Sequence, residues 1–152
     1  MRQIARPISP YLIDVPGQEY APARAGVTLS TFCLGFAALA ALTGMTLGIV
    51  MGIRQDFTLA PAHAHLNLLG WVTLAIYGLY HRTPGRIADR LGWAQALSAA
   101  AGAVLMSGGL ALYLASGDHG FVPVIITGSV LAFLGMALFL LLVVRDRPGI
   151  RA

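Results

Sequence analysis

The chain is poor in charge and in cysteine, and it contains no lysine. Of its 152 residues, only 11% are Asp, Glu, Lys or Arg, whereas 57% are hydrophobic, and the mean hydropathy is +0.76. So few charges cannot cover the surface of an ordinary water-soluble enzyme, which excludes that class. The single cysteine, Cys33, excludes an intrachain disulfide and a multi-cysteine zinc site. All ten basic residues are arginines without a long basic run, so the formal net charge of +4 does not indicate nucleic-acid binding.

The few charged residues divide the chain into four charge-free stretches, which are Ala25–Ile53, Phe57–His81, Leu91–Gly117 and His119–Val144. Each is long enough to cross a bilayer, because a spanning helix needs roughly 20 residues. A bilayer offers no water to unpaired peptide groups, and the stretches lack the alternation of a membrane barrel, so each must be helical. We therefore predict an all-α membrane protein with a transmembrane domain over 25–145 and spanning helices near 27–53, 61–81, 92–116 and 121–144.

The arginines predict the orientation of the chain in the lipid bilayer. Nine of the ten lie before the first predicted helix, between the second and third, or after the fourth, and only Arg54 lies at the opposite end. Since arginine accumulates on the cytoplasmic side, we expect cytoplasmic N and C termini, with irregular tails at 1–24 and 146–152. The same pattern, without a mitochondrial-type transit sequence, indicates a bacterial inner membrane.

The first predicted helix carries a row of glycines four residues apart, Gly44, Gly48 and Gly52. Such a row removes side chains from one face of a helix and lets another backbone approach closely. It indicates either a self-association or close-packing face, or only the general richness of membrane helices in glycine.

Three of the four histidines fall at the predicted outer end of the bundle. His63 and His65 open the second predicted helix, and His119 opens the fourth. Ionisable residues at membrane depth are costly and are usually functional. For His119, which follows a Ser-Gly-Asp loop, a solvated position in the headgroup layer is the favoured interpretation. His63 and His65 lie about one turn inside the helix, because Pro61 suits an early helical position.

The two-residue spacing of His63 and His65 limits what they can bind. On a helix of 3.6 residues per turn, residues two apart point to nearly opposite faces, so the pair cannot easily chelate one metal ion. If both rings are ligands, they serve two different sites. Neutral imidazole is a good ligand of haem iron and of copper, and a bis-histidine haem takes one ring from each of two helices.

The second predicted helix contains the segment AHAHLNLLGW at 62–71. It resembles the haem-ligating helices of the haem-copper oxidase superfamily, the catalytic subunits of terminal oxidases and nitric oxide reductases. The part HLNLL looks like the helix that supplies a low-spin haem ligand in nitric oxide reductases, and HAH looks like a later helix whose two histidines ligate two haems. In that family about twelve helices form three four-helix arcs, and this chain is one arc long. The resemblance implies a homotrimeric ring, with no complete catalytic centre in one chain.

The resemblance also implies a haem-b-binding protein with a role in electron transfer or redox sensing. In the simplest arrangement, His63 of one protomer and His65 of its neighbour ligate each haem. In a variant, the haem lies within one protomer between His65 and His119, and Arg54 pairs with a propionate. Bis-histidine ligation leaves no open iron position, which favours electron transfer over substrate turnover.

Two further residues of the second helix are candidates for haem contacts. Asn67 either orients a ligand ring or forms a hydrogen bond with a neighbouring helix, which is common in membranes. Trp71 either packs on the porphyrin or lies in the core or against lipid.

Two other functions are open from the sequence. One is a copper-binding protein of the outer membrane face, with an imidazole cluster of His63, His65 and His119 and with Met45, Met51 or Met106 as possible soft ligands. That cluster requires a non-helical start of the second helix, so that the first two histidines converge. The other is a non-catalytic accessory or assembly subunit of a larger respiratory complex, in which the histidines are structural remnants.

Overall fold

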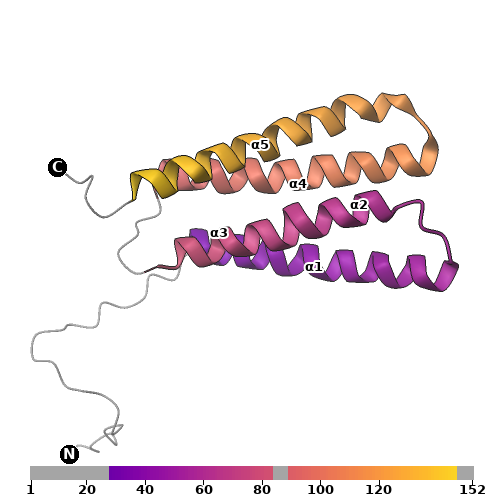
Figure 1. Cartoon of the computed structure of the whole chain (residues 1–152), viewed down its shortest axis with the longest axis horizontal. Helices are drawn as coiled ribbons and strands as arrows, with labels where there is room; N and C mark the ends of the chain where they lie inside the picture. Colours follow the sequence, from indigo (N-terminus) through magenta and orange to yellow (C-terminus); the bar gives the residue numbers. More distant parts are fainter. Residues whose placement is uncertain (1–27, 84–88, 147–152) are drawn as a thin grey trace, which may run out of the picture.

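The computed structural model describes residues 28–83 and 89–146, and all elements within these ranges are helices (Figure 1). The predicted all-α architecture is confirmed for this part of the chain. The predicted tails at 1–24 and 146–152 lie outside the described residues, apart from Asp146, which caps the last helix.

Long helices dominate the described residues. In order, the elements are α1 (Leu29–Arg54), α2 (Ala60–His65), the π-helix η1 (Leu66–Thr73), α3 (Leu74–His81), α4 (Arg90–Ser116), the 3₁₀-helix η2 (His119–Phe121) and α5 (Val122–Arg145). Among them, α1 with 26 residues, α4 with 27 and the 27-residue unit of η2 and α5 are long and apolar enough to cross a membrane. These three correspond to the first, third and fourth spanning helices predicted from the sequence.

The second predicted helix, 61–81, corresponds to three consecutive elements rather than one regular helix. These elements, α2, η1 and α3, have six, eight and eight residues and follow one another without a break. The middle one is a π-helix, in which the Thr73 hydroxyl donates to the carbonyl of Leu68, five residues earlier, at 2.7 Å. π-Helices are rare, and short π-helical turns within α-helices are often found at functional sites. This one begins directly after His65.

Side-chain caps explain why two helix starts differ from the predicted ones by two residues. The Thr28 hydroxyl accepts a hydrogen bond from the amide of Thr31, and α1 starts at Leu29. The Asp89 carboxylate accepts from the amide of Gly92 at 2.8 Å, and α4 starts at Arg90. Such caps satisfy amide groups that the first turn of a helix leaves unpaired.

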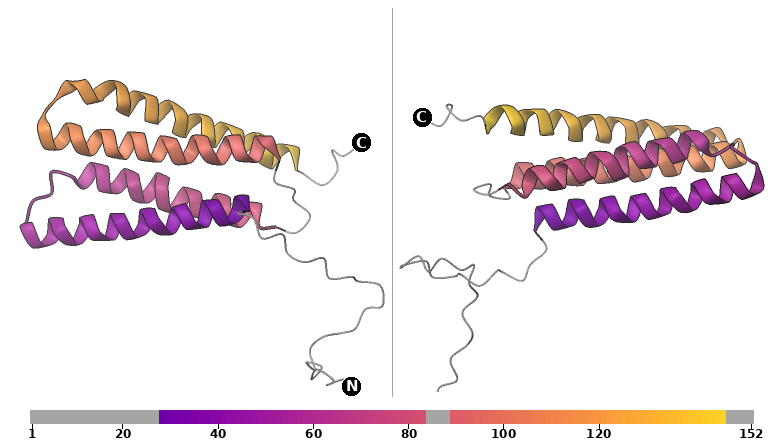
Figure 2. Two further views of the ribbon diagram at one scale, coloured as in Figure 1. Left: turned by 180° about the vertical axis from the view of Figure 1, so that it is seen from behind. Right: turned by 60° about the horizontal axis from the view of Figure 1, so that its bottom comes forward.

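The helices lie side by side along one direction (Figure 2). The continuous segment of α2, η1 and α3, here termed the rod, lies with α4 in the middle, and α1 and α5 lie on opposite sides of them (Figure 2). Contacts join α1 to η1 and α3, α2 and η1 to α4, and α4 to α5 along its length. The loops after α1 and after α4 lie at one end, here termed the outer end after the predicted orientation. The opposite end, with the start of α4 and the end of α5, is termed the inner end.

Glycines bring α4 and α5 into backbone contact. A Cβ at Gly102 would collide with the backbone of Ala132, and a Cβ at Gly128 with the backbone of Met106. A Cβ at Gly135 would lie 2.9 Å from Ala99. Such close approach replaces hydrophobic burial as the source of helix association in lipid, because the tails of lipids are as apolar as the side chains.

The buried core is small and rich in alanine, whereas large apolar side chains cover the outside. The core cluster consists of Leu29, Cys33, Ala37, Leu74, Tyr77, Ala96, Ala99 and Ala100. In contrast, Ile53 is 79% exposed and Phe133 is 77% exposed. A water-soluble protein rarely exposes so much apolar surface, so this pattern supports the predicted contact with lipid.

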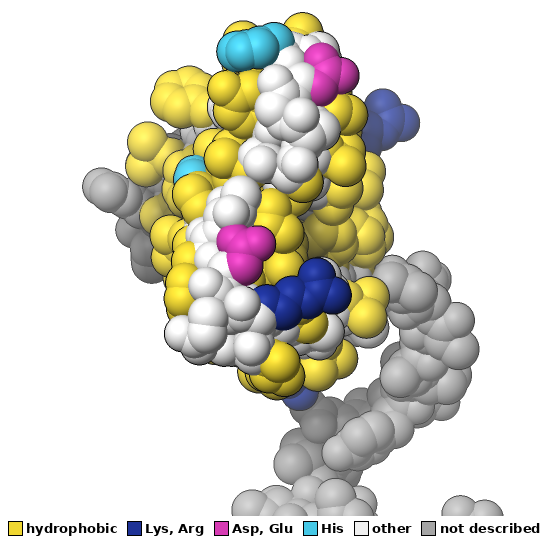
Figure 3. All heavy atoms as spheres, turned by 90° about the vertical axis from the view of Figure 1, so that its right-hand side faces the viewer, with side chains coloured by type: hydrophobic (Ala, Val, Ile, Leu, Met, Phe, Trp, Pro, Cys, Tyr) yellow, Lys and Arg dark blue, Asp and Glu magenta, His cyan; other side chains and the backbone are white. Residues whose placement is uncertain are grey.

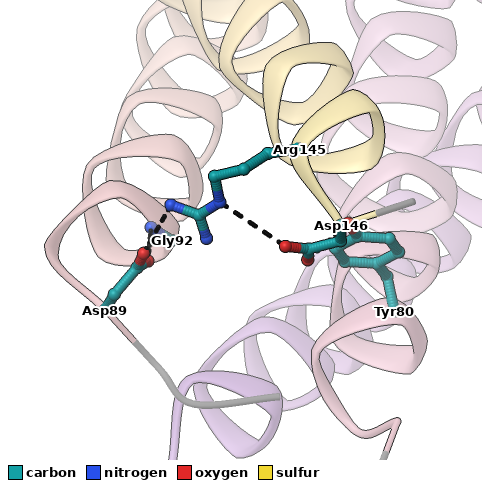
Figure 4. A network of polar contacts seen from close by, with 5 residues as sticks. All are labelled: Tyr80, Asp89, Gly92, Arg145 and Asp146. Carbon is teal, nitrogen blue, oxygen red and sulfur yellow. Dashed lines mark hydrogen bonds and ion pairs between the residues drawn. The ribbon is translucent and has the colours of Figure 1, made fainter. Parts of the chain in front are cut away.

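A polar network holds the helix ends together at the inner end (Figure 4). Arg145 of α5 forms an ion pair with Asp89 before α4, with 2.8 Å between Nη1 and Oδ2. Arg145 also lies 3.4 Å from Asp146, whose other carboxylate oxygen accepts a hydrogen bond from the Tyr80 hydroxyl of α3. This network connects the ends of α3 and α5 with the start of α4.

Candidate functional site

His63 and His65, the two histidines of α2, lie on different sides of the rod that α2, η1 and α3 form. His63 packs against α1, where a Cβ at Gly48 would lie 3.1 Å from its Cε1 atom. His65 faces a groove formed with α4 and α5. This placement agrees with the two-residue spacing, because α2 is regular up to His65. One metal ion cannot reach both rings in this conformation.

The orientation of His65 leaves one ring nitrogen suited to act as a ligand. Its Nδ1 atom lies 2.7 Å from the carbonyl oxygen of Pro61. A carbonyl can only accept a hydrogen bond, so Nδ1 carries the proton and Nε2 of the neutral ring keeps its lone pair. Metal-ligating histidines usually donate their second nitrogen to a carbonyl or carboxylate in this way, which fixes the tautomer and the ring.

The groove beside His65 has a volume of about 440 Å³ and is open on one side. Its other lining residues are Leu68, Leu69, Thr73, Tyr77, Ala99, Met106, Ser129, Ala132, Phe133 and Met136. Apolar walls with a few polar groups are typical of pockets for small molecules and cofactors.

His63 lies in a slot that the glycine row of α1 creates. Gly48 makes room for the His63 ring, and Gly44 makes room for Asn67, whose Oδ1 atom would be 2.5 Å from a Cβ at that position. Gly44 and Gly48 therefore form a close-packing face within the chain. Gly52, the third glycine of the row, has no atom within 4 Å of its potential Cβ among the described residues.

The Asn67 amide holds the backbone and the ring of His63. Its Nδ2 atom donates to the His63 carbonyl at 2.9 Å and lies 3.4 Å from Nδ1 and 3.3 Å from Nε2 of the ring. Two nearly equal distances place the amide over the face of the ring, because an in-plane position would collide with Cε1. The lone pair of the His63 ring lies in the ring plane, so this contact does not occupy it.

The remaining predicted site residues at the outer end are exposed. Histidine, aspartate and arginine side chains are visible there among apolar ones (Figure 3). Arg54 ends α1, and His119 stacks edge-on against Tyr113 with 5.5 Å between ring centres. In the loop between α1 and α2, the pKa of the Asp56 carboxyl is lowered by hydrogen bonds from the hydroxyl and amide of Thr58 and then by the charge of Arg54.

The three outer histidines do not converge within one chain. Among the described residues, no group of three or more His, Cys, Asp or Glu side chains could hold a metal ion. Trp71 is 46% exposed, and of the three candidate methionines Met45 is exposed, Met51 is buried, and Met106 lines the His65 groove.

Sequence analysis missed two contributors to this site. The Pro61 carbonyl, which fixes His65, belongs to a residue that the sequence marks only as a helix start. Met136 lines the groove from α5, and the Tyr77 hydroxyl donates to its Sδ atom at 3.5 Å. A single methionine in an apolar helix gives no signal that distinguishes a groove position from ordinary packing.

Comparison with protein-family models, curated proteins and solved structures found no match to this chain.

Proposed function

We propose that the chain is a haem-b-binding integral membrane protein with an electron-transfer or redox role, and that His65 is an axial ligand. The observation that carries the proposal is the hydrogen bond from His65 Nδ1 to the Pro61 carbonyl, with the ring on an apolar groove. This arrangement presents a neutral imidazole with Nε2 available to iron.

The residues of the groove fit a porphyrin chemically. Leu68, Leu69 and Phe133 offer an apolar surface to the macrocycle. Arg54 ends α1 and is not among the residues that line the groove, so it would pair with a propionate only in an arrangement that brings the end of an α1 helix to the groove. When bound, haem b supplies a one-electron redox centre. The chain contributes a fixed ligand tautomer and a low-dielectric surrounding, both of which tune an iron potential.

The second axial ligand in this proposal is His63 of a neighbouring protomer. His63 lies on the opposite side of the same rod, and its in-plane lone pair is not used by Asn67. Because the ring packs against Gly48 of its own α1, ligation in a neighbouring protomer requires it to turn out of that slot. A closed homotrimer repeats this pairing at each of three interfaces and uses every histidine pair once. In this proposal, α2, η1 and α3 together form a fourth membrane crossing. Both termini are cytoplasmic and the membrane is a bacterial inner membrane, as the arginine distribution indicates.

An absorption spectrum of the detergent-purified protein, oxidised and then reduced with dithionite, tests the proposal. We expect sharp reduced bands of low-spin haem b, with about one haem per chain by pyridine haemochrome assay. His65→Ala and His63→Ala should each abolish haem binding. His81→Ala is the matched control, because His81 bonds to Gln95 at the inner end and should retain haem.

Two results would contradict the proposal. A colourless protein after growth with sufficient haem would exclude haem and leave copper binding or a purely accessory role in a larger complex. Full haem content in His63→Ala would exclude the ligand from a neighbouring protomer.

A copper site is a second candidate, favoured by two thioethers in the His65 groove. Met106 of α4 and Met136 of α5 line it together with His65, and no Asp or Glu is among its described lining residues. Neutral imidazole and thioether ligands suit Cu(I), since an apolar site without a carboxylate disfavours a divalent ion. Copper retained by haem-free protein, and lost in Met106→Leu but not in Met45→Leu, would support this candidate.

A further inference from the structure

An open cavity of about 760 Å³ lies at the inner end of the bundle, where α1 begins and α3 ends. Its lining comes from the first two turns of α1 and from the end of α3, and includes Thr28, Thr31, Leu34, Gly35, His81 and Arg82. It shares no described lining residue with the groove of His65. The cavity is therefore separate from the candidate haem site.

Contacts between the helices hold the walls of this cavity in place. The Ser30 hydroxyl of α1 donates a hydrogen bond to the carbonyl of Gly78 in α3 at 2.9 Å. Leu34 packs where Gly78 lacks a side chain, since a Cβ at Gly78 would lie 2.7 Å from its Cγ atom. His81 is held from α4, with 3.1 Å between its Nε2 atom and Oε1 of Gln95. Packed helices thus fix the shape of the cavity.

Polar groups that can donate hydrogen bonds gather at one end of the cavity. Arg82 is exposed and forms no ion pair with another described residue. The hydroxyls of Thr28 and Thr31 share a hydrogen bond of 2.7 Å, and whichever of the two donates it, the other keeps a hydrogen that it can donate outward. No Asp or Glu is among the described lining residues, so this end suits an anion.

The other end of the cavity is apolar and lies deeper along α1. A rise of 1.5 Å per residue places Gly35 about 10 Å from Thr28 along the helix axis. No described atom lies within 4 Å of a potential Cβ at Gly35, so this end is not filled by a side chain of the bundle. Since α1 is long and apolar enough to cross a membrane, its start lies at the membrane surface and Gly35 lies toward the hydrocarbon. This order of polar and apolar surface is that of a phospholipid.

We infer that the cavity binds one phospholipid of net negative charge, with its phosphate on Arg82 and the Thr28–Thr31 hydroxyl pair and an acyl chain along Leu34 and Gly35. Arginine pairs with phosphate oxygens through two parallel hydrogen bonds, and basic pockets between membrane helices bind anionic headgroups. The inference rests on the membrane location of α1. It does not depend on haem in the groove of His65, nor on which side of the membrane the inner end faces.

Native mass spectrometry of the detergent-purified full chain tests this site. The protein is titrated with phosphatidylglycerol or with phosphatidylcholine of the same acyl chains, and inorganic phosphate is added as a competitor. We expect one phosphatidylglycerol per chain to bind several-fold more tightly than phosphatidylcholine, and inorganic phosphate not to displace it. Arg82→Gln should weaken phosphatidylglycerol binding about five-fold, the effect of one arginine near an anionic lipid surface. Arg54→Gln is the matched control, because Arg54 is exposed at the opposite end of α1 and should bind as wild type.

A second pair of variants tests the apolar end of the cavity. Gly35→Leu places a side chain where the acyl chain would lie and should lower the affinity for phosphatidylglycerol several-fold. Gly52→Leu is its control, because Gly52 also belongs to α1 and has no described atom within 4 Å of its potential Cβ.

Four results would overturn the inference. Equal affinity for the two lipids, or equal losses in Arg82→Gln and Arg54→Gln, would leave only non-specific lipid contact. Displacement of phosphatidylglycerol by inorganic phosphate, or unchanged affinity in Gly35→Leu, would show that no acyl chain occupies the cavity and would assign its polar end to a free anion.

Discussion

The ring of His65 is oriented by a residue that contributes only a carbonyl. Pro61 lies in the first turn of α2, one turn before His65, and its oxygen accepts the Nδ1 proton. Residues four apart on a helix are neighbours, so this spacing brings the ring to the carbonyl without any other element. His63 instead depends on its neighbour α1, because its position requires the missing side chain of Gly48.

A methyl group added at Gly48, which makes room for the His63 ring, should destabilise the protein. A methyl group added at Gly52, the next glycine of the row, should not. We expect Gly48→Ala to lower the free energy of unfolding by about 1 kcal/mol, because its Cβ would lie 3.1 Å from Cε1 of His63 and the ring would have to shift by a few tenths of an ångström. The matched control is Gly52→Ala, which meets no described atom within 4 Å and should change stability by less than about 0.5 kcal/mol. Denaturant titration in mixed micelles measures both. Equal losses in the two variants would contradict the slot.

For single residues, the sequence predicts on which face of a helix a side chain lies, but not which atoms it contacts. Helical periodicity places His63 and His65 on different sides of their rod, and the structure agrees. The sequence leaves the role of Asn67 open between orienting a ligand ring and bonding another helix, and the structure places its amide against both the ring and the carbonyl of His63. Such contacts depend on side-chain rotamers and on the packing of α1, which periodicity does not encode.

Among the helices, backbone contact between α4 and α5 is the most demanding packing feature. At Gly128 an added Cβ meets the backbone of Met106, and a backbone cannot move aside as a flexible side chain can. The two helices would have to separate along their whole contact to accept a larger residue.

Gly128→Ala should therefore be among the most destabilising single-methyl additions in the chain. We expect a loss of about 2–3 kcal/mol in the free energy of unfolding, measured by denaturant titration in mixed micelles. Gly108→Ala in α4 is the control, because nothing described lies within 4 Å of its Cβ, and better helix propensity should leave it neutral or slightly more stable. Similar behaviour of the two variants would contradict the close contact.

The start of α4 should make stability depend on pH. A hydrogen bond from the Gly92 amide, and then Arg145, lower the pKa of the Asp89 carboxyl from its usual 3.8. A lowered pKa in the folded state stabilises the protein above the usual value, and this contribution is lost as pH falls through the lower one. The ion pair adds little, because the two side chains are 47% and 38% exposed.

Asp89→Ala should accordingly lower the free energy of unfolding by about 0.5–2 kcal/mol at pH 7, through loss of the helix cap. The difference from wild type should shrink as pH falls below the usual carboxyl pKa, which melting curves between pH 7 and pH 3 will measure. Asp89→Ser keeps an uncharged cap, so its own stability should lack this pH dependence. A constant difference between wild type and Asp89→Ala at all pH values would exclude the carboxylate as its source.

The sequence predicts the long elements well, because charge-free length alone identifies α1, α4 and α5. It does not predict the π-helix η1. An apolar run reads alike in an α-helix and a π-helix, and it gives no signal of the bond from the Thr73 hydroxyl to the Leu68 carbonyl that accompanies η1.

At the scale of the whole molecule, the open arrangement of the helices decides how copies of the chain could assemble. α1 and α5 lie on opposite sides of the bundle (Figure 2). The groove of His65 is open rather than enclosed. In the proposed ring, a second copy closes this groove and brings its own His63 to the iron. Length and composition predict the membrane location, but they do not predict how copies meet, because lipid-facing and copy-facing helix surfaces are equally apolar.

Co-expression of two haem-free variants distinguishes haem ligation between protomers from haem ligation within one chain. His63→Ala and His65→Ala should each be free of haem when expressed alone, because every interface lacks one ligand. Co-expressed in equal amounts, they should regain about one quarter of the wild-type haem content, since one ordered pairing in four joins an intact His63 to an intact His65. The double variant His63→Ala/His65→Ala, co-expressed with His63→Ala, is the control and should stay colourless. If the mixture of single variants also stays colourless although the two chains co-purify, no haem is shared between protomers and the ring is excluded.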